Sequence, residues 1–190
     1  MVFDDMERCT PEEVQRLLSH VSEQRCEEAM KFKHIFGQFT CLKSYAMLLE
    51  MLLKHGLITE ATLPDFVRNT HGKPDLKDVP GVYFNLSHTK QAIAVAIGDH
   101  PVGVDVEGFK QPTQSLLQYT MNEDEIRRVQ QSAYPDQTFT TLWTQKEALF
   151  KYYGTGITSS IKELLTSIPI HVSMESRLNL EKGYALTIVS

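Results

Sequence analysis

Two carboxylates, Asp105 and Glu107, stand two residues apart in the run Gly-Val-Asp-Val-Glu at 103–107. On a β-strand, alternate side chains point to the same face, so these two acids would be presented together. Neighbouring anions repel each other unless a cation lies between them. Oxygen ligands of this kind suit Mg²⁺, which takes one or two protein carboxylates and completes its shell with phosphate and water oxygens. Two exposed acids at the end of a strand would give the same pattern.

A second group of reactive side chains occurs in the run Trp-Thr-Gln-Lys-Glu-Ala-Leu-Phe-Lys at 143–151. Glu147 and Lys151 are four residues apart, so they share a face if this run is a helix. Glu147 could then be a third metal ligand or a proton acceptor, and Lys151 could contact a phosphate. An ordinary surface ion pair, worth about 0.3 kcal/mol, would have the same spacing.

Two shorter patterns place polar or basic side chains near expected turns. Ser87 and His88 end the run Tyr-Phe-Asn-Leu-Ser-His, and both could bind a phosphate. They do not indicate a catalytic triad, because triad members meet in space and the chain has no Gly-x-Ser-x-Gly elbow. Gly72, Lys73 and Pro74 are a turn signal, and no P-loop sequence occurs. Taken singly, a structural histidine and a plain surface turn remain the simpler explanations.

The elements that must position these residues are predicted from capping signals and apolar spacing. Helices are expected from Thr10 onward, over 22–36 and over 38–55, and again from Asn122 onward, over 138–153 and over 160–165. Strands are expected over 82–86, 92–97, 101–107, 168–174 and 184–189. Helices and strands segregated in this way indicate an α+β fold.

Bulk properties exclude several classes of protein. A chain of 190 residues with a net charge of −5 is large enough for a real core and is not a general nucleic-acid binder. No stretch approaches the ~20 apolar residues of a membrane span, so no membrane association is expected. Cys9, Cys26 and Cys41 form no Cys-x-x-Cys pair, which is typical of reduced thiols in the cytoplasm.

The order and spacing of the four motifs are more specific than any one of them. Gly-Lys-Pro, then Phe-Asn-Leu-Ser-His, then Gly-Val-Asp-Val-Glu, then Trp-Thr-x-Lys-Glu-Ala-x-x-Lys resembles the 4′-phosphopantetheinyl transferase superfamily. The closest likeness is to its surfactin-synthetase-activating type, in which two similar halves form one pseudo-dimeric chain. Together with the order of helices and strands along the chain, this suggests two halves, each with a helix packed on a small antiparallel sheet, and we place them at 1–100 and 101–190.

The resemblance also implies roles for individual residues. Asp105, Glu107 and Glu147 match the acids that hold Mg²⁺, for which Mn²⁺ is a possible substitute. Lys151 matches a lysine that contacts the phosphates of coenzyme A and protonates the leaving group. The base that deprotonates the acceptor serine would be Glu147, Glu123 or a water on the metal. Residues expected to bind coenzyme A are Lys31, Lys43, Gly72, Lys73, Pro74, Ser87, His88 and Lys151.

The implied reaction transfers the 4′-phosphopantetheine arm of coenzyme A to a serine of an apo acyl or peptidyl carrier protein and releases 3′,5′-ADP. A monomer is expected, because a pseudo-dimer already supplies both sides of a cleft. Two other functions use the same residues. One is a Mg²⁺-dependent phosphohydrolase acting on nucleotides, and the other is a non-catalytic module that binds coenzyme A or a carrier.

Overall fold

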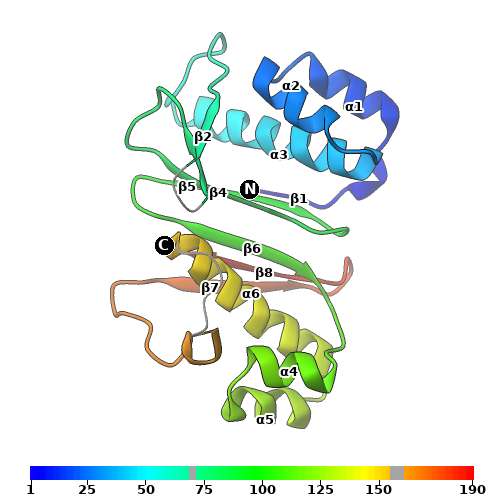
Figure 1. Ribbon diagram of the computed structural model, residues 1–190, viewed down its shortest axis with the longest axis vertical. Coiled ribbons are helices and arrows are strands. Elements are labelled where there is room, and N and C mark those ends of the chain that lie inside the picture. The colour runs from blue at the N-terminus through cyan, green and yellow to red at the C-terminus, as the bar shows by residue number, and fades with distance from the viewer. Residues whose placement is uncertain (69–71, 155–160) are drawn as a thin grey trace.

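The computed structural model describes residues 1–68, 72–154 and 161–190. Helices α1 to α3 lie at one end of its long axis, α4 and α5 lie at the other, and the strands lie between (Figure 1). The helices are α1 (Pro11–Leu18), α2 (Glu23–Met30), α3 (Ile35–Lys54), α4 (Gln114–Thr120), α5 (Glu123–Gln131) and α6 (Pro135–Tyr153), with short 3₁₀ turns η1 (Met6–Arg8) and η2 (Ile161–Glu163). The strands are β1 (Val2–Phe3), β2 (Phe66–Arg68), β3 (Pro74–Leu76), β4 (Tyr83–His88), β5 (Ile93–Gly98), β6 (Gly103–Gly108), β7 (Met174–Asn179) and β8 (Tyr184–Val189).

The first unit is an antiparallel sheet of order β1-β5-β4 with α3 packed on it. Side chains of β5 alternate between two faces of this sheet, as a strand requires. Ile93 and Val95 face the large core that α3 closes, whereas Ala94 and Ala96 belong to a separate apolar cluster shared with β6 and β8. Small alanines on this face let the second unit approach closely.

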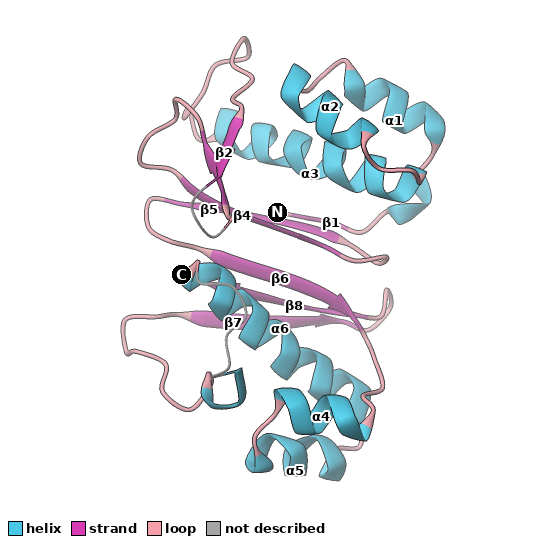
Figure 2. Ribbon diagram, viewed as in Figure 1, coloured by secondary structure: helices cyan, strands magenta, loops and turns pink. Residues whose placement is uncertain are grey.

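The second unit is an antiparallel sheet of order β6-β8-β7, with α6 lying across it (Figure 2). Val104 and Val106 of β6 point toward the alanines of the first unit. Residues 103, 105 and 107 therefore point to the other face, toward α6. This alternation is what directs the two acids of β6 at the helix that carries Glu147 and Lys151.

The two units connect their elements in the same order. The first runs from β1 through α3 to the hairpin β4–β5, and β5 pairs with β1. The second runs from β6 through α6 to the hairpin β7–β8, and β8 pairs with β6. The fold is therefore α+β with small antiparallel sheets, as expected. The pseudo-dimeric relation of the halves stays a prediction. So does the division at residue 100, which falls in the turn between β5 and β6.

The two sheets meet along β4 and β6 without pairing as backbone ladders. Side chains of β4 bridge them instead. Asn85 Oδ1 accepts a hydrogen bond from the Val104 N–H, and Ser87 Oγ accepts one from the Val106 N–H, each at 3.2 Å. We call this junction the seam. Buried backbone groups need partners, and these two polar side chains supply them. Asn85 and Ser87 are alternate residues of β4, so both lie on the face directed toward β6.

Gly103 sets how closely α6 lies against β6. A Cβ atom at this position would be 2.0 Å from the carbonyl oxygen of Ala148 and 2.7 Å from the backbone nitrogen of Tyr152. Only a residue without a side chain fits there. The glycine therefore lets the last turns of α6, including Lys151, approach the acids of β6.

Several predicted element boundaries are confirmed and others are wrong. The Thr10 cap and the Asn122–Glu125 capping box are present. The helix expected over 22–36 is instead two helices, because the chain turns after Met30 and packs the Phe32 ring against Gly37. The strand expected over 168–174 is wrong, since the last hairpin begins with β7 at Met174. Residue 160 of the short predicted helix lies outside the described residues.

Replacing Gly103 with alanine should destabilise the fold by about 2–3 kcal/mol, because backbone on α6 must move to accept the new methyl group. Gly108→Ala on the same strand is the matched control, since its Cβ would meet only the flexible end of the Gln91 side chain. Denaturant unfolding measures both. Equal losses of stability in the two variants would contradict the close approach of α6.

Candidate active site

The centre of the candidate site is Asp105, whose side chain is 3% exposed. Its Oδ1 accepts hydrogen bonds from Ser87 Oγ at 2.8 Å and from Lys151 Nζ at 2.7 Å. Its Oδ2 is buried and has no hydrogen-bond partner; among the described residues, the only other such side-chain oxygen is Glu125 Oε1. A buried carboxylate oxygen left unpaired is costly, so Oδ2 is a position at which a further ligand would be stabilised.

Lys151 brings the positive charge to this centre. Its ammonium group donates to Ser87 Oγ at 3.0 Å, to the Val104 carbonyl at 3.1 Å and to Asp105 Oδ1 at 2.7 Å. An ammonium has three protons, so all of them have protein acceptors. To bind a phosphate oxygen, Lys151 must give up at least one of these acceptors.

The other two predicted acids, Glu107 and Glu147, both lie within the electrostatic influence of Asp105. Burial raises the pKa of Glu107, and the charge of Asp105 adds to the effect, while a hydrogen bond from the Trp143 side chain opposes it. Burial also raises the pKa of Glu147, with further contributions from Asp105 and Glu107 against the attraction of Lys151. The three carboxylates are therefore neighbours, and Lys151, with Lys110 near Glu107, offsets only part of their negative charge.

These residues fit a hard divalent cation by their chemistry. Three carboxylates, one with an unpaired buried oxygen, are the type of donor set that Mg²⁺ uses. As the side chains stand, however, no three His, Cys, Asp or Glu residues within 1–68, 72–154 and 161–190 are arranged to enclose a metal ion. A shared cation on Asp105, Glu107 and Glu147 therefore stays a prediction.

A cavity of about 560 Å³ lies in the first unit, beside the end of β4. Three cationic side chains, one histidine, one acid and two aromatic rings are among the residues that line it; they are Arg25, Lys31, Arg68, His88, Glu28, Phe32 and Phe66. We call it the cationic cavity. Its charge and its aromatic faces suit a ligand that combines phosphate groups with a planar base.

His88 lies at the rim of the cationic cavity, with part of its ring exposed and the Phe36 ring against it at a centroid distance of 6.2 Å. The protein atoms around the ring lower its pKa by desolvation, and the charges of Lys151 and Arg25 lower it further. The neutral imidazole is therefore favoured until an anion arrives.

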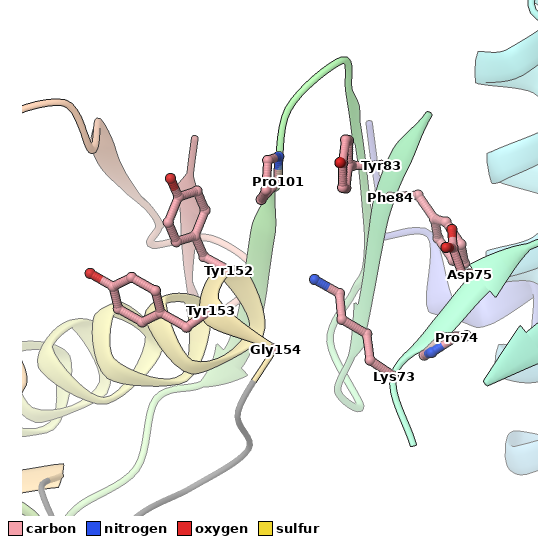
Figure 3. Close-up of a pocket in the computed structure, with 9 residues that line it drawn as sticks. All are labelled: Lys73, Pro74, Asp75, Tyr83, Phe84, Pro101, Tyr152, Tyr153 and Gly154. Carbon is pink, nitrogen blue, oxygen red and sulfur yellow. The ribbon is translucent and has the colours of Figure 1, made fainter. Parts of the chain in front are cut away.

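A smaller cavity of about 300 Å³ lies between β3 and the end of α6, as Figure 3 shows. Lys73, which directly precedes β3, extends across this cavity toward α6, from which Tyr152 and Tyr153 project (Figure 3). The Lys73 ammonium donates a hydrogen bond to the backbone carbonyl of Lys151 at 2.7 Å. Pro74 lines this cavity and the cationic cavity.

Lys146, the neighbour of Glu147 in the same motif, is fully buried and has a different role. Its ammonium donates to Glu125 Oε2 at 2.7 Å and to the carbonyls of Thr120, Ile161 and Lys162. These contacts fasten α4, α5 and η2 to α6. Lys146 is therefore structural.

Comparison with known proteins gives one consistent family. The model of the 4′-phosphopantetheinyl transferase superfamily matches residues 101–188. The match covers somewhat under half of the chain, and the chain is similar to this superfamily there. It is 25% identical to the 4′-phosphopantetheinyl transferase ffp of Bacillus subtilis and 23% identical to Sfp of strain 168, covering 90% of this chain and 75% of each relative. It is 28% identical to gsp of Aneurinibacillus migulanus over 77% of this chain and 64% of that protein.

These similarities support the predicted enzyme type and the predicted likeness to Sfp-type relatives. The chain spans about two thirds to three quarters of the length of these relatives. No helix of the described part is both long and apolar enough to cross a membrane. Similarity alone decides neither the carrier, the metal nor the mechanism.

Two predicted residues are not brought to the site. Glu123 is exposed at the start of α5, which packs on α6 at the far end of the molecule from β6 (Figure 1). Its role as a base stays a prediction, and the geometry favours Glu147. The Lys43 ammonium lies 4.4 Å from the centroid of the Phe3 ring, and Lys43 does not line the cationic cavity. Its phosphate contact likewise stays a prediction.

Arg25 and Arg68 line the cationic cavity but were missed in the sequence. The guanidinium of Arg25 is held by the Cys41 carbonyl, at 2.7 Å from Nη2, and by Glu28, at 2.8 Å from Nη1. It also lies 5.2 Å from the centroid of the Phe66 ring. Arg25 is the only arginine between residues 17 and 67, a signal that could have drawn attention to it.

Glu147→Gln should make the metal-free protein more stable at neutral pH. There the wild-type carboxylate is ionised although burial and two neighbouring acids disfavour its charge. As pH falls through its raised pKa, the wild-type residue becomes protonated and neutral like glutamine, so the difference in stability should disappear. Denaturant unfolding in EDTA across this range measures it.

The exposed Glu181→Gln is the control for that comparison and should show no such pH dependence. A wild type more stable than Glu147→Gln at neutral pH in EDTA would contradict the charge crowding at the site.

Lys146→Met should lower the free energy of unfolding by about 3–5 kcal/mol, because it leaves the buried Glu125 carboxylate without its partner. Arg177→Met removes a comparable but exposed ion pair with Glu175 and should change stability little. Similar small effects of both substitutions would mean that Lys146 does not fasten α5 to α6.

Proposed function

We propose that this chain transfers the 4′-phosphopantetheine arm of coenzyme A to a serine of an apo acyl or peptidyl carrier protein and releases 3′,5′-ADP. The observation that carries the proposal is the junction of Asp105, Lys151 and Ser87 beside two further acids. It offers a buried carboxylate oxygen for a cation and an ammonium for a phosphate within one site, as phosphoryl transfer needs.

The cationic cavity supports binding of the nucleotide part of coenzyme A. Arg25, Lys31 and Arg68 would meet its phosphate groups, and the rings of Phe32 and Phe66 offer faces for the adenine. A phosphate would compete with Glu28 for the two arginines. Glu28 already accepts a hydrogen bond from Arg25, and its carboxylate lies 3.8 Å from an Arg68 nitrogen. Gly72, Lys73 and Pro74 would border the same ligand, with Pro74 on the cavity wall.

Glu147 is the residue we propose as the base that accepts the proton of the carrier serine. It lies among the charges of Asp105, Glu107 and Lys151, whereas Glu123 is exposed at the start of α5. Lys151, one helical turn further on, would exchange an acceptor for an oxygen of the diphosphate and stabilise negative charge on the leaving group.

Asp105, Glu107 and Glu147 would hold Mg²⁺, which neutralises charge on the diphosphate when it is bound. Mn²⁺ would be a substitute. The carrier protein, the nucleotide and the cation would all meet where β4, β6 and α6 come together. We further propose that the enzyme acts in the cytoplasm as a monomer.

The direct test incubates the purified protein with coenzyme A and a panel of apo carriers, and mass spectrometry detects the phosphopantetheine arm on the acceptor serine. Transfer is expected with Mg²⁺ or Mn²⁺ and not in EDTA. Release of phosphate from nucleotides without any carrier would instead indicate a phosphohydrolase. Binding of coenzyme A with no modified carrier across the panel would indicate a non-catalytic module.

Asp105→Asn keeps the shape of the side chain but removes the charge, and it should lower transfer by at least ~100-fold. Asp99→Asn changes a fully exposed aspartate on the neighbouring turn and should leave transfer unchanged. Circular dichroism checks that both variants are folded. Wild-type turnover in folded Asp105→Asn would rule out the proposed role of this carboxylate.

A further inference from the structure

Lys73 reaches from the segment before β3 to the helix that carries Lys151. Its ammonium donates a hydrogen bond to the backbone carbonyl of Lys151 at 2.7 Å, across 78 positions of the chain. The contact is partly buried, so water screens it less than a surface contact. Figure 3 shows the Lys73 side chain extending toward the end of α6. The bond therefore joins two segments that are distant in the sequence, close to the candidate site.

The bond is made where a helix needs partners from outside. The last four carbonyl groups of an α-helix have no N–H donor within the helix, and Lys151 carries one of them on α6. The first of the four, on Phe150, accepts the N–H of Gly154, whose left-handed backbone ends the helix. The next carbonyl accepts the Lys73 ammonium. A positive charge is also favoured at this end of a helix, because the macrodipole is negative there.

The backbone around Lys73 is held by residues of the cationic cavity. Arg68 of β2, whose side chain lines that cavity, donates a hydrogen bond to the Gly72 carbonyl at 3.0 Å. Pro74, on the other side of Lys73, pairs with Arg68 in the β2–β3 ladder and lines the cavity as well. The chain on both sides of Lys73 is therefore fixed to the wall of the region suited to a nucleotide.

The position of the Lys151 backbone decides what its side chain can reach. The Lys151 ammonium meets Asp105 Oδ1 at 2.7 Å because the last turns of α6 lie close to β6. Gly103 makes room for that approach, but room alone does not hold the helix in place. The Lys73 bond restrains the backbone of the same residue whose side chain enters the site.

We infer that Lys73 is a positioning residue, which holds the last turn of α6 through the Lys151 carbonyl and so keeps the Lys151 ammonium at Asp105. The role belongs to the Lys73 side chain and is compatible with a nucleotide contact by Gly72–Pro74. Because residues on both sides of Lys73 are fixed to the cationic cavity, it also ties the position of Lys151 to that cavity. The choice of arm transfer as the reaction that Lys151 serves rests on the proposed function.

The test compares Lys73→Met, which keeps the length of the side chain but loses the ammonium, with Lys73→Arg, which retains a charged donor. Lys77→Met removes an exposed lysine just after β3 and is the matched control. Trace labelling with acetic anhydride, read by mass spectrometry, measures the reactivity of Lys151 in the protein alone, without coenzyme A or carrier. The fully buried Lys146 reports in the same experiment whether a variant has begun to unfold.

If Lys73 positions Lys151, the lysine should become more reactive in Lys73→Met while Lys146 stays protected. The Lys151 side chain is 28% exposed, so local release toward full exposure should raise its labelling about threefold. In transfer assays kcat should fall by about 10–100-fold, the scale expected for a small misplacement of a catalytic group. That loss should exceed any change in coenzyme A affinity, measured by calorimetry in EDTA. Lys73→Arg should recover most of both effects, and Lys77→Met should behave like the wild type.

Two results would overturn the inference. Unchanged labelling of Lys151 in Lys73→Met, whatever happens to coenzyme A binding, would mean that the carbonyl contact does not hold the catalytic lysine. Equal rises in the labelling of Lys151 and Lys146 would mean that Lys73 only stabilises the fold.

Because the labelling uses neither coenzyme A nor a carrier, the inference and the proposed function fail separately. A wild-type protein that transfers no arm, but whose Lys151 becomes more reactive in Lys73→Met and not in Lys77→Met, would contradict the function and support the inference. An active wild-type enzyme whose Lys151 is labelled equally in Lys73→Met would support the function and contradict the inference.

Discussion

The ion pair between Lys151 and Asp105 is the interaction on which the rest of the site depends. A buried carboxylate without a partner is strongly destabilising, and Asp105 is almost completely buried. Both units contribute to holding Lys151. The seam and the β6 backbone bind its ammonium, while Lys73 binds its carbonyl. The close approach permitted by Gly103 is what brings the lysine within reach of the acid, so the packing of α6 and the charge balance of the site are one constraint.

The same site carries more negative charge than its lysine neutralises. Glu107 and Glu147 are disfavoured as anions by burial and by Asp105, and this raises their pKa values. The pair of Lys146, five residues before Lys151 on α6, with Glu125 of α5 shows the contrasting case: one acid, one buried ammonium and three backbone carbonyls. The Lys146–Glu125 pair stabilises the fold by itself. The Lys151–Asp105 pair leaves a local excess of negative charge that a cation would relieve. Functional sites commonly depart from the best local choice in this way.

Local patterns in the sequence were sufficient where a segment alone decides its structure. The alternation around Asp105 predicted β6, and the capping signals predicted the starts of α1 and α5. The failures lie where distant contacts decide. β7 is a polar edge strand formed by pairing with β8, so the apolar run before it was mistaken for the strand. The break between α2 and α3 has no proline, and its one sign is Gly37, which makes room for Phe32. Similarly, no local pattern shows that the Ser87 hydroxyl is already used by two residues of the second unit.

Strand β4 explains how two separate sites would act on one substrate. Because neighbouring side chains on a strand point to opposite faces, Leu86 and His88 line the cationic cavity while Asn85 and Ser87 face the seam. Adjacent residues 87 and 88 thus connect the region suited to a nucleotide with the acids suited to a cation. A shift of β4 by one residue would exchange the two faces and lose both sites together. The pairing of all six β4 residues with β5 fixes that register, so the alignment of nucleotide and cation follows from the sheet of the first unit as much as from the acids of the second.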